Sequence, residues 1–570
     1  MKVSSVIAGL GLLAEAYAQS SRSPAVTSNG TVLAVFIYHN HCDRTSIYAP
    51  DGRWTGGLFG APGATMCYQD GTYYWNKYFR KSSPLKIWGT SQIYERSYTN
   101  AEAPNEPIAV QSAMAFMQGL FKPVDLQSSV TSGENMLESD NSTFMNGPLS
   151  GFQYVPITTY RSSDPDAIYT AGDLLDCNNQ QVSSSLYFSS DDYREADRES
   201  IAFYISLYQP YFAGVFPRTW MTYFYAYKLY DYVNQNRAAE NATLLAMPEE
   251  DFQRLRLYAN RQQFNLYANT TSATSPNWID PAYNYHRREI GGRALAGKIA
   301  LMLNNSMQSD RMQNRFNFAL GDFDPMLSFF AISNLTSRSD DFYGIPDLGS
   351  SMVFEVYTDD PRMRTAQPTT YDVSIKVAFG FRNGTTVDDT LTYWPLFDTD
   401  PQGGPPSMPL KQFLTKMDEV KIGNLGTWCT ACNSQTEFCR NAIIPQTSNS
   451  GSDESQGSTT PAASHRGMAP AVAGVIGAII MAVIVGIAAA VAFFLFGVGV
   501  RREHRRSSVL SNIGRKEKVS SEIELPLSPT AGPMARSFED DIEYDYGTAS
   551  TAATKVASPL ASPEEAHFKT

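Results

Sequence analysis

Two histidines and an arginine lie close together in the segment FIYHNHCDRTSIY, residues 36–48. His39, His41 and Arg44 follow the apolar run TVLAVFIY (31–38), which is typical of a fully buried strand. In α/β proteins, functional residues gather where strands end at the carboxyl edge of the sheet. A histidine can act as a nucleophile, and an arginine can bind phosphate oxygens through paired hydrogen bonds. We therefore expect a site for phosphate chemistry after this strand.

The same residue types also occur in loops without a chemical role. A histidine and an arginine that follow a buried strand can simply cap the loop and pair with a carboxylate. Residue types alone do not separate this alternative from a catalytic site. The elements around the loop must therefore be considered.

Strand-like and helix-like segments alternate along the chain. The predicted strands are 31–38, 315–320, 351–358 and 371–382, and the predicted helices are 107–121, 219–237, 249–267, 289–303 and 325–335. Such alternation is typical of α/β proteins. We expect an α/β fold with a mainly parallel central sheet flanked by helices, and a helical cap inserted at about residues 125–285.

In this order and spacing, the segments resemble the histidine acid phosphatases, a branch of the histidine phosphatase superfamily that includes secreted phytases and fungal acid phosphatases. The resemblance covers nearly all of residues 19–445. It rests on the first strand and its loop, and on SAMAFMQGLF (112–121), IGGRALAGKIALML (290–303), ALGDFDPMLSFFAI (319–332), SSMVFEVY (350–357) and YDVSIKVAFGFRNG (371–384). It implies hydrolysis of a phosphate monoester or an inositol phosphate, with no metal and no cofactor.

The resemblance also implies a mechanism. In the family, a histidine in an Arg-His-Gly-x-Arg loop attacks phosphorus and becomes a phosphohistidine, while arginines hold the phosphate oxygens. A later His-Asp pair stabilises the transferring group and protonates the leaving oxygen. In this alignment His41 is the nucleophile, Arg44 binds phosphate and Asp324 is the proton donor. A slip of one residue would make Asp322 the matching acid instead.

Several family positions are replaced. Asn40 and Ile108 stand in place of arginines, Cys42 in place of the glycine and Phe323 in place of the second histidine. We expect Arg44, Asn40 and His39 to contact the substrate, with His39 restoring some positive charge when protonated. Loss of one preorganised contact typically costs on the order of 3 kcal/mol of transition-state stabilisation. The chain is therefore either a strongly weakened phosphatase or an inactive pseudophosphatase that acts as a phosphate-ester-binding, sensor or structural surface protein.

Both ends of the chain predict a single-pass membrane protein. Residues 1–18 combine Lys2, a short apolar core and Ala16-Tyr17-Ala18, which is the pattern of a secretory signal peptide. Residues 471–500 carry no charge and are long enough for a transmembrane helix. The basic cluster 501–506 places the C-terminus in the cytoplasm. We expect a type I protein at the plasma membrane or cell surface.

The sequons and cysteines agree with this topology. All N-x-Ser/Thr sequons precede residue 471: Asn29, Asn141, Asn241, Asn269, Asn304, Asn334 and Asn383. All six cysteines also precede it: Cys42, Cys67, Cys177, Cys429, Cys432 and Cys439. This distribution predicts a disulfide-bonded glycoprotein ectodomain. The sequence does not choose among the many pairings. We interpret Cys429-x-x-Cys432 as part of a local disulfide group rather than a zinc or redox site.

The remaining segments indicate partners other than nucleic acid. A net charge of −12 gives no reason to expect nucleic-acid binding. Residues 446–470 form a Ser/Thr-rich stalk, and residues 501–570 a disordered cytoplasmic tail open to cytoplasmic partners. A stripe of small residues in the apolar segment allows a weak homodimer: Ala478, Ala482, Gly486 and Ala490.

Overall fold

The computed structural model describes residues 30–48, 55–124, 148–170, 176–270, 288–308, 313–360, 374–386, 390–397 and 406–443. The chain divides into two units, Met1–Gly451 and Ser452–Thr570, and every described residue belongs to the first. The predicted signal peptide, stalk, transmembrane segment and tail lie outside the described residues. Within the described part of the chain, no helix combines the length and the apolar character that a membrane crossing requires.

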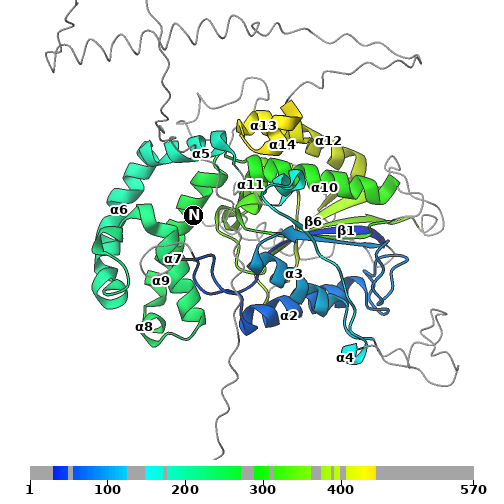
Figure 1. Ribbon diagram of the computed structural model, residues 1–570, viewed down its shortest axis with the longest axis horizontal. Coiled ribbons are helices and arrows are strands. Elements are labelled where there is room, and N and C mark those ends of the chain that lie inside the picture. Colours follow the sequence, from blue (N-terminus) through cyan, green and yellow to red (C-terminus); the bar gives the residue numbers. More distant parts are fainter. Residues whose placement is uncertain are drawn as a thin grey trace, which may run out of the picture. The chain divides into compact units, whose positions relative to one another are not determined.

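A central β-sheet organises the described domain, with the strand order β3-β2-β4-β1-β5-β6-β7 and β8 beside β6 (Figure 1). The strands are β1 (Thr31–Asn40), β2 (Thr99–Pro104), β3 (Thr158–Tyr160), β4 (Phe316–Gly321), β5 (Ser351–Thr358), β6 (Ile375–Arg382), β7 (Thr392–Trp394) and β8 (Ser407–Pro409). β4 pairs in parallel with both β1 and β2, and β2 pairs in parallel with β3. β5, β6, β7 and β8 pair antiparallel.

The sheet is therefore mixed, and the prediction of a mainly parallel sheet is wrong. Parallel neighbours need a crossover connection, which is usually a helix. β5 to β8 follow one another with no helix between them among the described residues, so they pair antiparallel. The parallel half of the sheet, β3-β2-β4-β1, is the half that carries the loop of His41.

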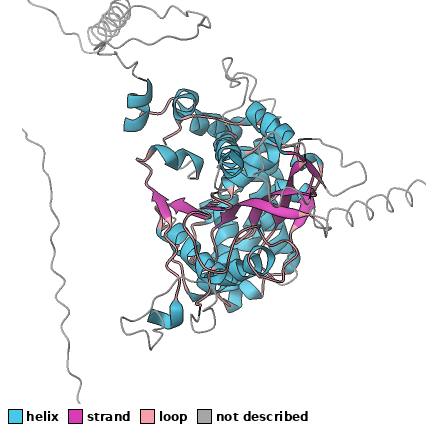
Figure 2. Cartoon of the chain, turned by 90° about the vertical axis from the view of Figure 1, so that its right-hand side faces the viewer, coloured by secondary structure: helices cyan, strands magenta, loops and turns pink. Residues whose placement is uncertain are grey.

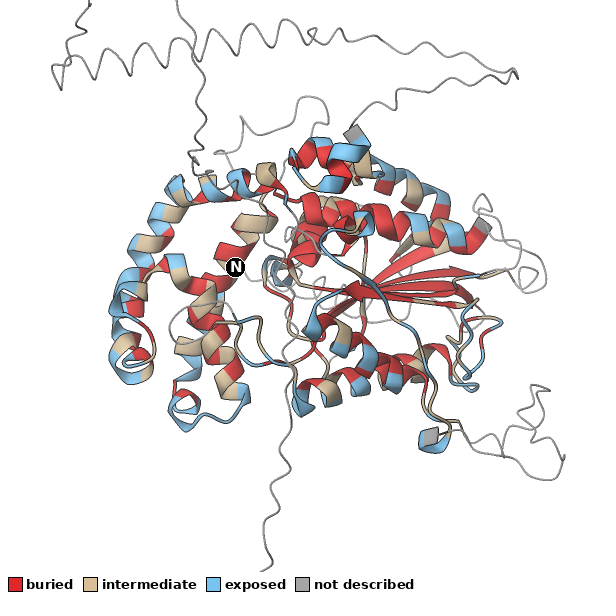
Figure 3. Ribbon diagram, viewed as in Figure 1, coloured by how far each residue is buried: buried red, intermediate tan, exposed pale blue. Residues whose placement is uncertain are grey.

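Helices cover both faces of the sheet (Figures 1 and 2). α2 (Ala61–Tyr78) and α3 (Pro107–Leu120) pack on one face, and α10 (Ile290–Gln308), α11 (Asp324–Ile332) and α12 (Leu410–Val420) pack on the other. All ten residues of β1 are buried, and so are all residues of its neighbours β4 and β5, so the centre of the sheet is buried (Figure 3). Side chains alternate along a strand, so Val35 and Ile37 face α2 and α3 while Phe36 and Tyr38 face the opposite helices.

Most predicted core elements form where the sequence places them. β5 and α9 (Glu249–Tyr267) have the predicted bounds, and α3 and β4 differ from the prediction by a single residue at their ends. The predicted helix 219–237 is shorter. Extended backbone at Thr222 interrupts it, so two short 3₁₀ turns precede α7 (Ala226–Ala238).

The cap is a helical subdomain with its own apolar cluster, at the left in Figure 1. Its helices are α5 (Asn178–Ser185), α6 (Asp191–Leu207), α7, α8 (Ala242–Leu245) and α9. The predicted insertion 125–285 is not entirely helical, because β3 at Thr158–Tyr160 joins the edge of the sheet beside β2. The described helical cap thus extends from Asn178 to Tyr267.

All six cysteines form disulfides, as predicted. The pairs are Cys42–Cys67, Cys177–Cys432 and Cys429–Cys439. Cys429 and Cys432 bind different partners, so the two cysteines of this motif are not bonded to each other. The Cys42–Cys67 bond joins the loop after β1 to α2, which restrains the backbone next to His41.

Five of the predicted glycosylation sites lie among the described residues. Asn241 and Asn383 are exposed, and Asn269, Asn304 and Asn334 are partly exposed. None of the five is buried, so each is accessible to a glycosyltransferase in the folded domain. Glycosylation itself stays a prediction.

Candidate active site

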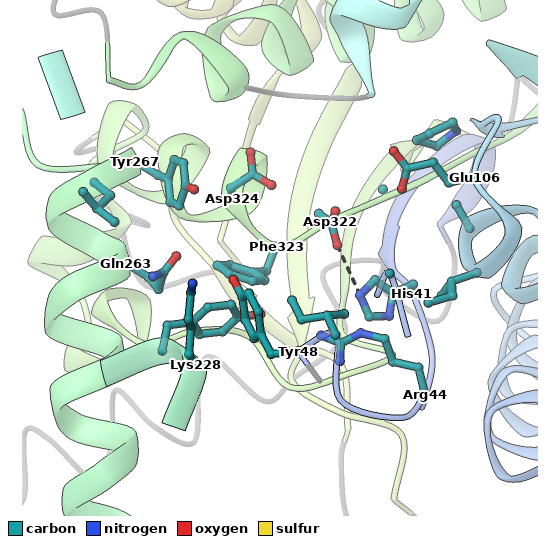
Figure 4. A pocket seen from close by; sticks show the side chains of 18 of the residues that line it. His41, Arg44, Tyr48, Glu106, Lys228, Gln263, Tyr267, Asp322, Phe323 and Asp324 are labelled. Atoms are coloured by element: carbon teal, nitrogen blue, oxygen red, sulfur yellow. Dashed lines mark ion pairs between the residues drawn. The ribbon is translucent and has the colours of Figure 1, made fainter. Parts of the chain in front are cut away.

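His41 lies at the carboxyl edge of the sheet, directly after β1. Its Nδ1 is 2.9 Å from the carbonyl oxygen of Cys42, and its Nε2 is 3.2 Å from Oδ1 of Asp322 (Figure 4). Asp322 directly follows β4, whose last residue Gly321 lies opposite Asn40 in the parallel pair. Parallel pairing of the two strands therefore brings these side chains to one place, although they are far apart in sequence.

The contact with Asp322 determines which ring nitrogen of His41 carries a proton. An ionised carboxylate can only accept hydrogen bonds, so the Nε2–H of His41 donates to Asp322. Burial alone raises the pKa of Asp322, but the hydrogen bond and charge of His41 and the charge of Arg44 outweigh burial and lower that pKa. Asp322 is therefore ionised. In this pair Nε2, the ring nitrogen that faces the cavity, has no free lone pair with which to attack phosphorus.

Arg44 is held by the cap. Its Nη1 donates to Oδ1 of Asp231 on α7 at 2.9 Å and to the Thr45 carbonyl oxygen at 3.1 Å. Asp231 also accepts hydrogen bonds from the Ser46 hydroxyl at 2.6 Å and from the Ile47 N–H at 3.1 Å. Burial alone lowers the pKa of Arg44, but the charge and hydrogen bond of Asp231, together with Tyr227 and the Asp322 charge, outweigh burial and raise it. A carboxylate thus neutralises the Arg44 charge. This is the arrangement expected of an arginine that holds the loop in place, and not of an arginine whose charge is free to bind phosphate.

His39 is placed away from the cavity. It continues the alternation of Val35 and Ile37, so its side chain faces α2 and α3, where Nε2 contacts Asp70. Asp70 is also paired with Arg382. Burial, aided by the Arg382 charge, lowers the pKa of His39 to about 3. His39 is therefore neutral at ordinary pH and cannot supply the positive charge that the sequence suggested.

Asn40 is placed away from the cavity too. It is the last residue of β1 and is fully buried. Its Nδ2 donates to the carbonyl oxygen of Asp347 at 3.3 Å. Two of the three predicted substrate-binding residues, His39 and Asn40, are thus part of the packed core in this structure.

A cavity of about 370 Å³ lies between the sheet edge and the cap. The sheet side supplies His41, Arg44, Glu106, Asp322 and Asp324, and the cap side supplies Lys228, Gln262 and Gln263. Six aromatic residues also line the cavity: Tyr48, Phe188, Phe224, Tyr227, Tyr267 and Phe323. The structure therefore brings together His41, Arg44 and Asp324 of the predicted site, in a cavity of the size that small ligands occupy.

The two candidate acids have different positions in this cavity. Asp324 is the first residue of α11 and is buried. Asp322 lies one residue after β4 and makes the ion pair with His41. Asp322 is therefore the carboxylate within hydrogen-bonding reach of His41, and Asp324 lies farther along the wall (Figure 4).

Sequence reasoning missed three charged residues of this region. Glu106 lies at the start of α3, two residues after β2, and a strand prediction for 99–104 would have drawn attention to it. Lys228 and Asp231 lie on α7 of the cap, and no local pattern distinguishes them from other charged residues on a surface helix. Among the described residues, no group of three or more histidine, cysteine or acidic side chains is arranged to hold a metal ion.

Neither a family model nor a curated protein matches the chain. Solved structures do match it. The phytase from Citrobacter braakii is 12% identical, with a TM-score of 0.44, over 70% of this chain and 99% of that one. The Klebsiella sp. ASR1 phytase is 11% identical, with a TM-score of 0.45, over 70% and 97%.

A third neighbour is the multiple inositol polyphosphate phosphatase of Bifidobacterium longum in complex with inositol hexasulfate. It is 10% identical, with a TM-score of 0.44, over 71% of this chain and 96% of that one. Two of these three neighbours are thus phytases, and the third is an inositol polyphosphate phosphatase.

Proposed function

We propose that the domain of residues 30–443 is a pseudophosphatase, which binds a small polar ligand in the His41 cavity without hydrolysing phosphomonoesters. The observation that supports this proposal is the 3.2 Å contact between His41 Nε2 and Asp322 Oδ1. A carboxylate on the nucleophilic nitrogen keeps that nitrogen protonated. It also repels the phosphate that would have to approach it.

The charges of the cavity support the same proposal. Phosphate binding needs cations whose charge is not already neutralised. Arg44 is paired with Asp231, and His41 is paired with Asp322. Glu106 and Asp324 add two further carboxyl groups to the wall. The part of the cavity around His41 therefore favours a cationic or neutral group over a phosphate.

Weak phosphomonoester hydrolysis is the second candidate. In this function His41 would form the phosphohistidine, and Asp322 or Asp324 would protonate the leaving oxygen. One observation favours it. The contact between Nδ1 and the Cys42 carbonyl oxygen directs Nε2 towards the cavity, which is the orientation that a nucleophile needs.

We further propose that the domain is displayed outside the cell as a glycosylated type I protein of the plasma membrane. The membrane anchor is the apolar segment 471–500, and the signal is residues 1–18. Support comes from the three disulfides, which persist in oxidising compartments, and from the accessible sequon asparagines.

Phosphate release by the purified full-length chain tests the choice between binding and hydrolysis. Release from p-nitrophenyl phosphate and inositol hexakisphosphate is measured between pH 3 and pH 7, beside His41→Ala. We expect equal, background rates for both proteins. A wild-type rate that exceeds the His41→Ala rate a hundredfold would establish the hydrolytic function instead.

A further inference from the structure

Lys228 is a cation in the cavity wall that has no anionic partner in the described part of the chain. Its Nζ lies 4.8 Å from the ring centre of Tyr48, 5.3 Å from that of Trp220 and 5.6 Å from that of Tyr225. Aromatic faces stabilise an ammonium group but accept no conventional hydrogen bonds. Among the described residues, no oxygen accepts a hydrogen bond from Nζ and no carboxylate pairs with it. Burial lowers the pKa of Lys228, as expected for a desolvated ammonium group.

The other side of the cavity carries the opposite charge. Glu106 and Asp322 lie close enough for their charges to interact. Burial raises the pKa of Glu106, and the Asp322 charge raises it further, against the weaker opposing effect of His41. Two carboxylates that repel each other across an open cavity favour a cation between them. His41 occupies one side of Asp322 only, and Glu106 has no protein cation within ion-pair distance in the described part of the chain.

We infer that the cavity binds an amphoteric small molecule, whose ammonium group lies between Glu106 and Asp322 and whose anionic group lies at Lys228. In Figure 4, Lys228 and Glu106 lie at opposite sides of the pocket, with His41 and Asp322 between them. The aromatic wall would contact the chain that joins the two charged groups. The anionic group is a phosphate ester or a carboxylate, since both present oxygen acceptors to an ammonium group. This inference rests on the proposal that the site binds rather than hydrolyses.

Matched ligands test the inference by calorimetric titration of the purified full-length chain. The amphoteric probes are aminoalkyl phosphates of two, four and six carbons, because the span of the site sets the best length. Hexyl phosphate lacks the ammonium group, hexylamine lacks the anion, and 6-aminohexanoate carries a carboxylate in place of the phosphate. We expect the best aminoalkyl phosphate or 6-aminohexanoate to bind at least tenfold more tightly than hexyl phosphate and hexylamine.

Two variants locate the ends of the ligand. Lys228→Met retains the aliphatic contacts with the rings and should weaken the amphoteric ligand at least tenfold without changing the affinity for hexylamine. Glu106→Gln should weaken the amphoteric ligand and hexylamine but not hexyl phosphate. Lys411→Met and Glu250→Gln remove exposed charges outside the cavity and should change nothing.

Three results would overturn the inference. These are equal affinity for hexyl phosphate and the amphoteric probes, no binding of any probe at 10 mM ligand, or tight inositol hexakisphosphate binding that Glu106→Gln leaves unchanged. A further possible result is His41-dependent release of phosphate from a bound aminoalkyl phosphate. That result would refute the proposed lack of hydrolysis while leaving the charge arrangement of the ligand intact.

Discussion

Asp231 on cap helix α7 is hydrogen-bonded to Arg44 on the loop that follows β1, at 2.9 Å. The two residues are 187 positions apart in sequence, and their side chains are 2% and 4% exposed. One contact therefore attaches the cap to the loop of His41 and neutralises the arginine that a phosphate would need. Its removal should affect stability and ligand binding at once.

Asp231→Leu should lower the free energy of unfolding by about 3 kcal/mol or more, because it leaves a buried, unpaired guanidinium. Denaturation in urea measures this loss. Arg44→Met combined with Asp231→Leu should recover most of it, because the double variant contains no unpaired charge. A cost below about 1 kcal/mol for Asp231→Leu alone would show that the pair does not hold the cap.

Asp322→Asn should bind inorganic phosphate about tenfold more tightly than the wild-type chain. Two unit charges 4 Å apart interact by about 4 kcal/mol at an effective dielectric constant of 20. The Asp322 side chain is 36% exposed, so solvent screening reduces this repulsion. Calorimetric titration measures the affinity, with the exposed Asp340→Asn as a control. Unchanged phosphate affinity in Asp322→Asn would mean that this carboxylate does not exclude phosphate.

His39 should make the domain less stable in acid. Its pKa is about 3 in the folded state and about 6.5 in an unfolded chain, so below pH 6.5 the unfolded state binds the extra proton. The stabilisation is complete above pH 6.5 and is lost as the pH falls towards 3, by about 1.4 kcal/mol per pH unit.

The free energy of unfolding measured at pH 7, 6, 5 and 4 checks this pH dependence. Between pH 6 and pH 4, His39→Gln should show a slope smaller than that of wild type by about 1.4 kcal/mol per pH unit. Other groups that titrate in this range contribute equally to both proteins. Identical slopes would show that His39 is protonated in the folded state.

Gly119→Ala should destabilise the packing of α3 against α2. A Cβ at Gly119 would lie 2.0 Å from the carbonyl oxygen of Tyr68, and backbone cannot move away as a side chain can. We expect a loss of about 1–3 kcal/mol in the free energy of unfolding. Gly426→Ala is the matched helical control, since its Cβ would meet only Asn424 Oδ1 at 3.5 Å. Equal stability of the two variants would contradict the close helix contact.

Local pattern in the sequence was sufficient for most of the core. The apolar run of β1 and the periodicity of α9 predict those elements, because burial on a strand or a helix leaves a regular spacing of apolar residues. The alternation of side chains along a strand would also have placed His39, because it lies two and four residues after Ile37 and Val35. Its side chain therefore faces the same helices as theirs. The polar loop after β1 likewise indicated where the cavity lies.

Only the tertiary structure decided what that cavity can do. The sequence could not choose between Asp322 and Asp324, could not pair the cysteines and could not foresee that Asp231 of the cap neutralises Arg44. It also missed the antiparallel half of the sheet. These features depend on contacts between residues that are far apart in the sequence. Such contacts are set by the strand order and by the packing of the cap, and neither produces a periodic pattern in the local sequence.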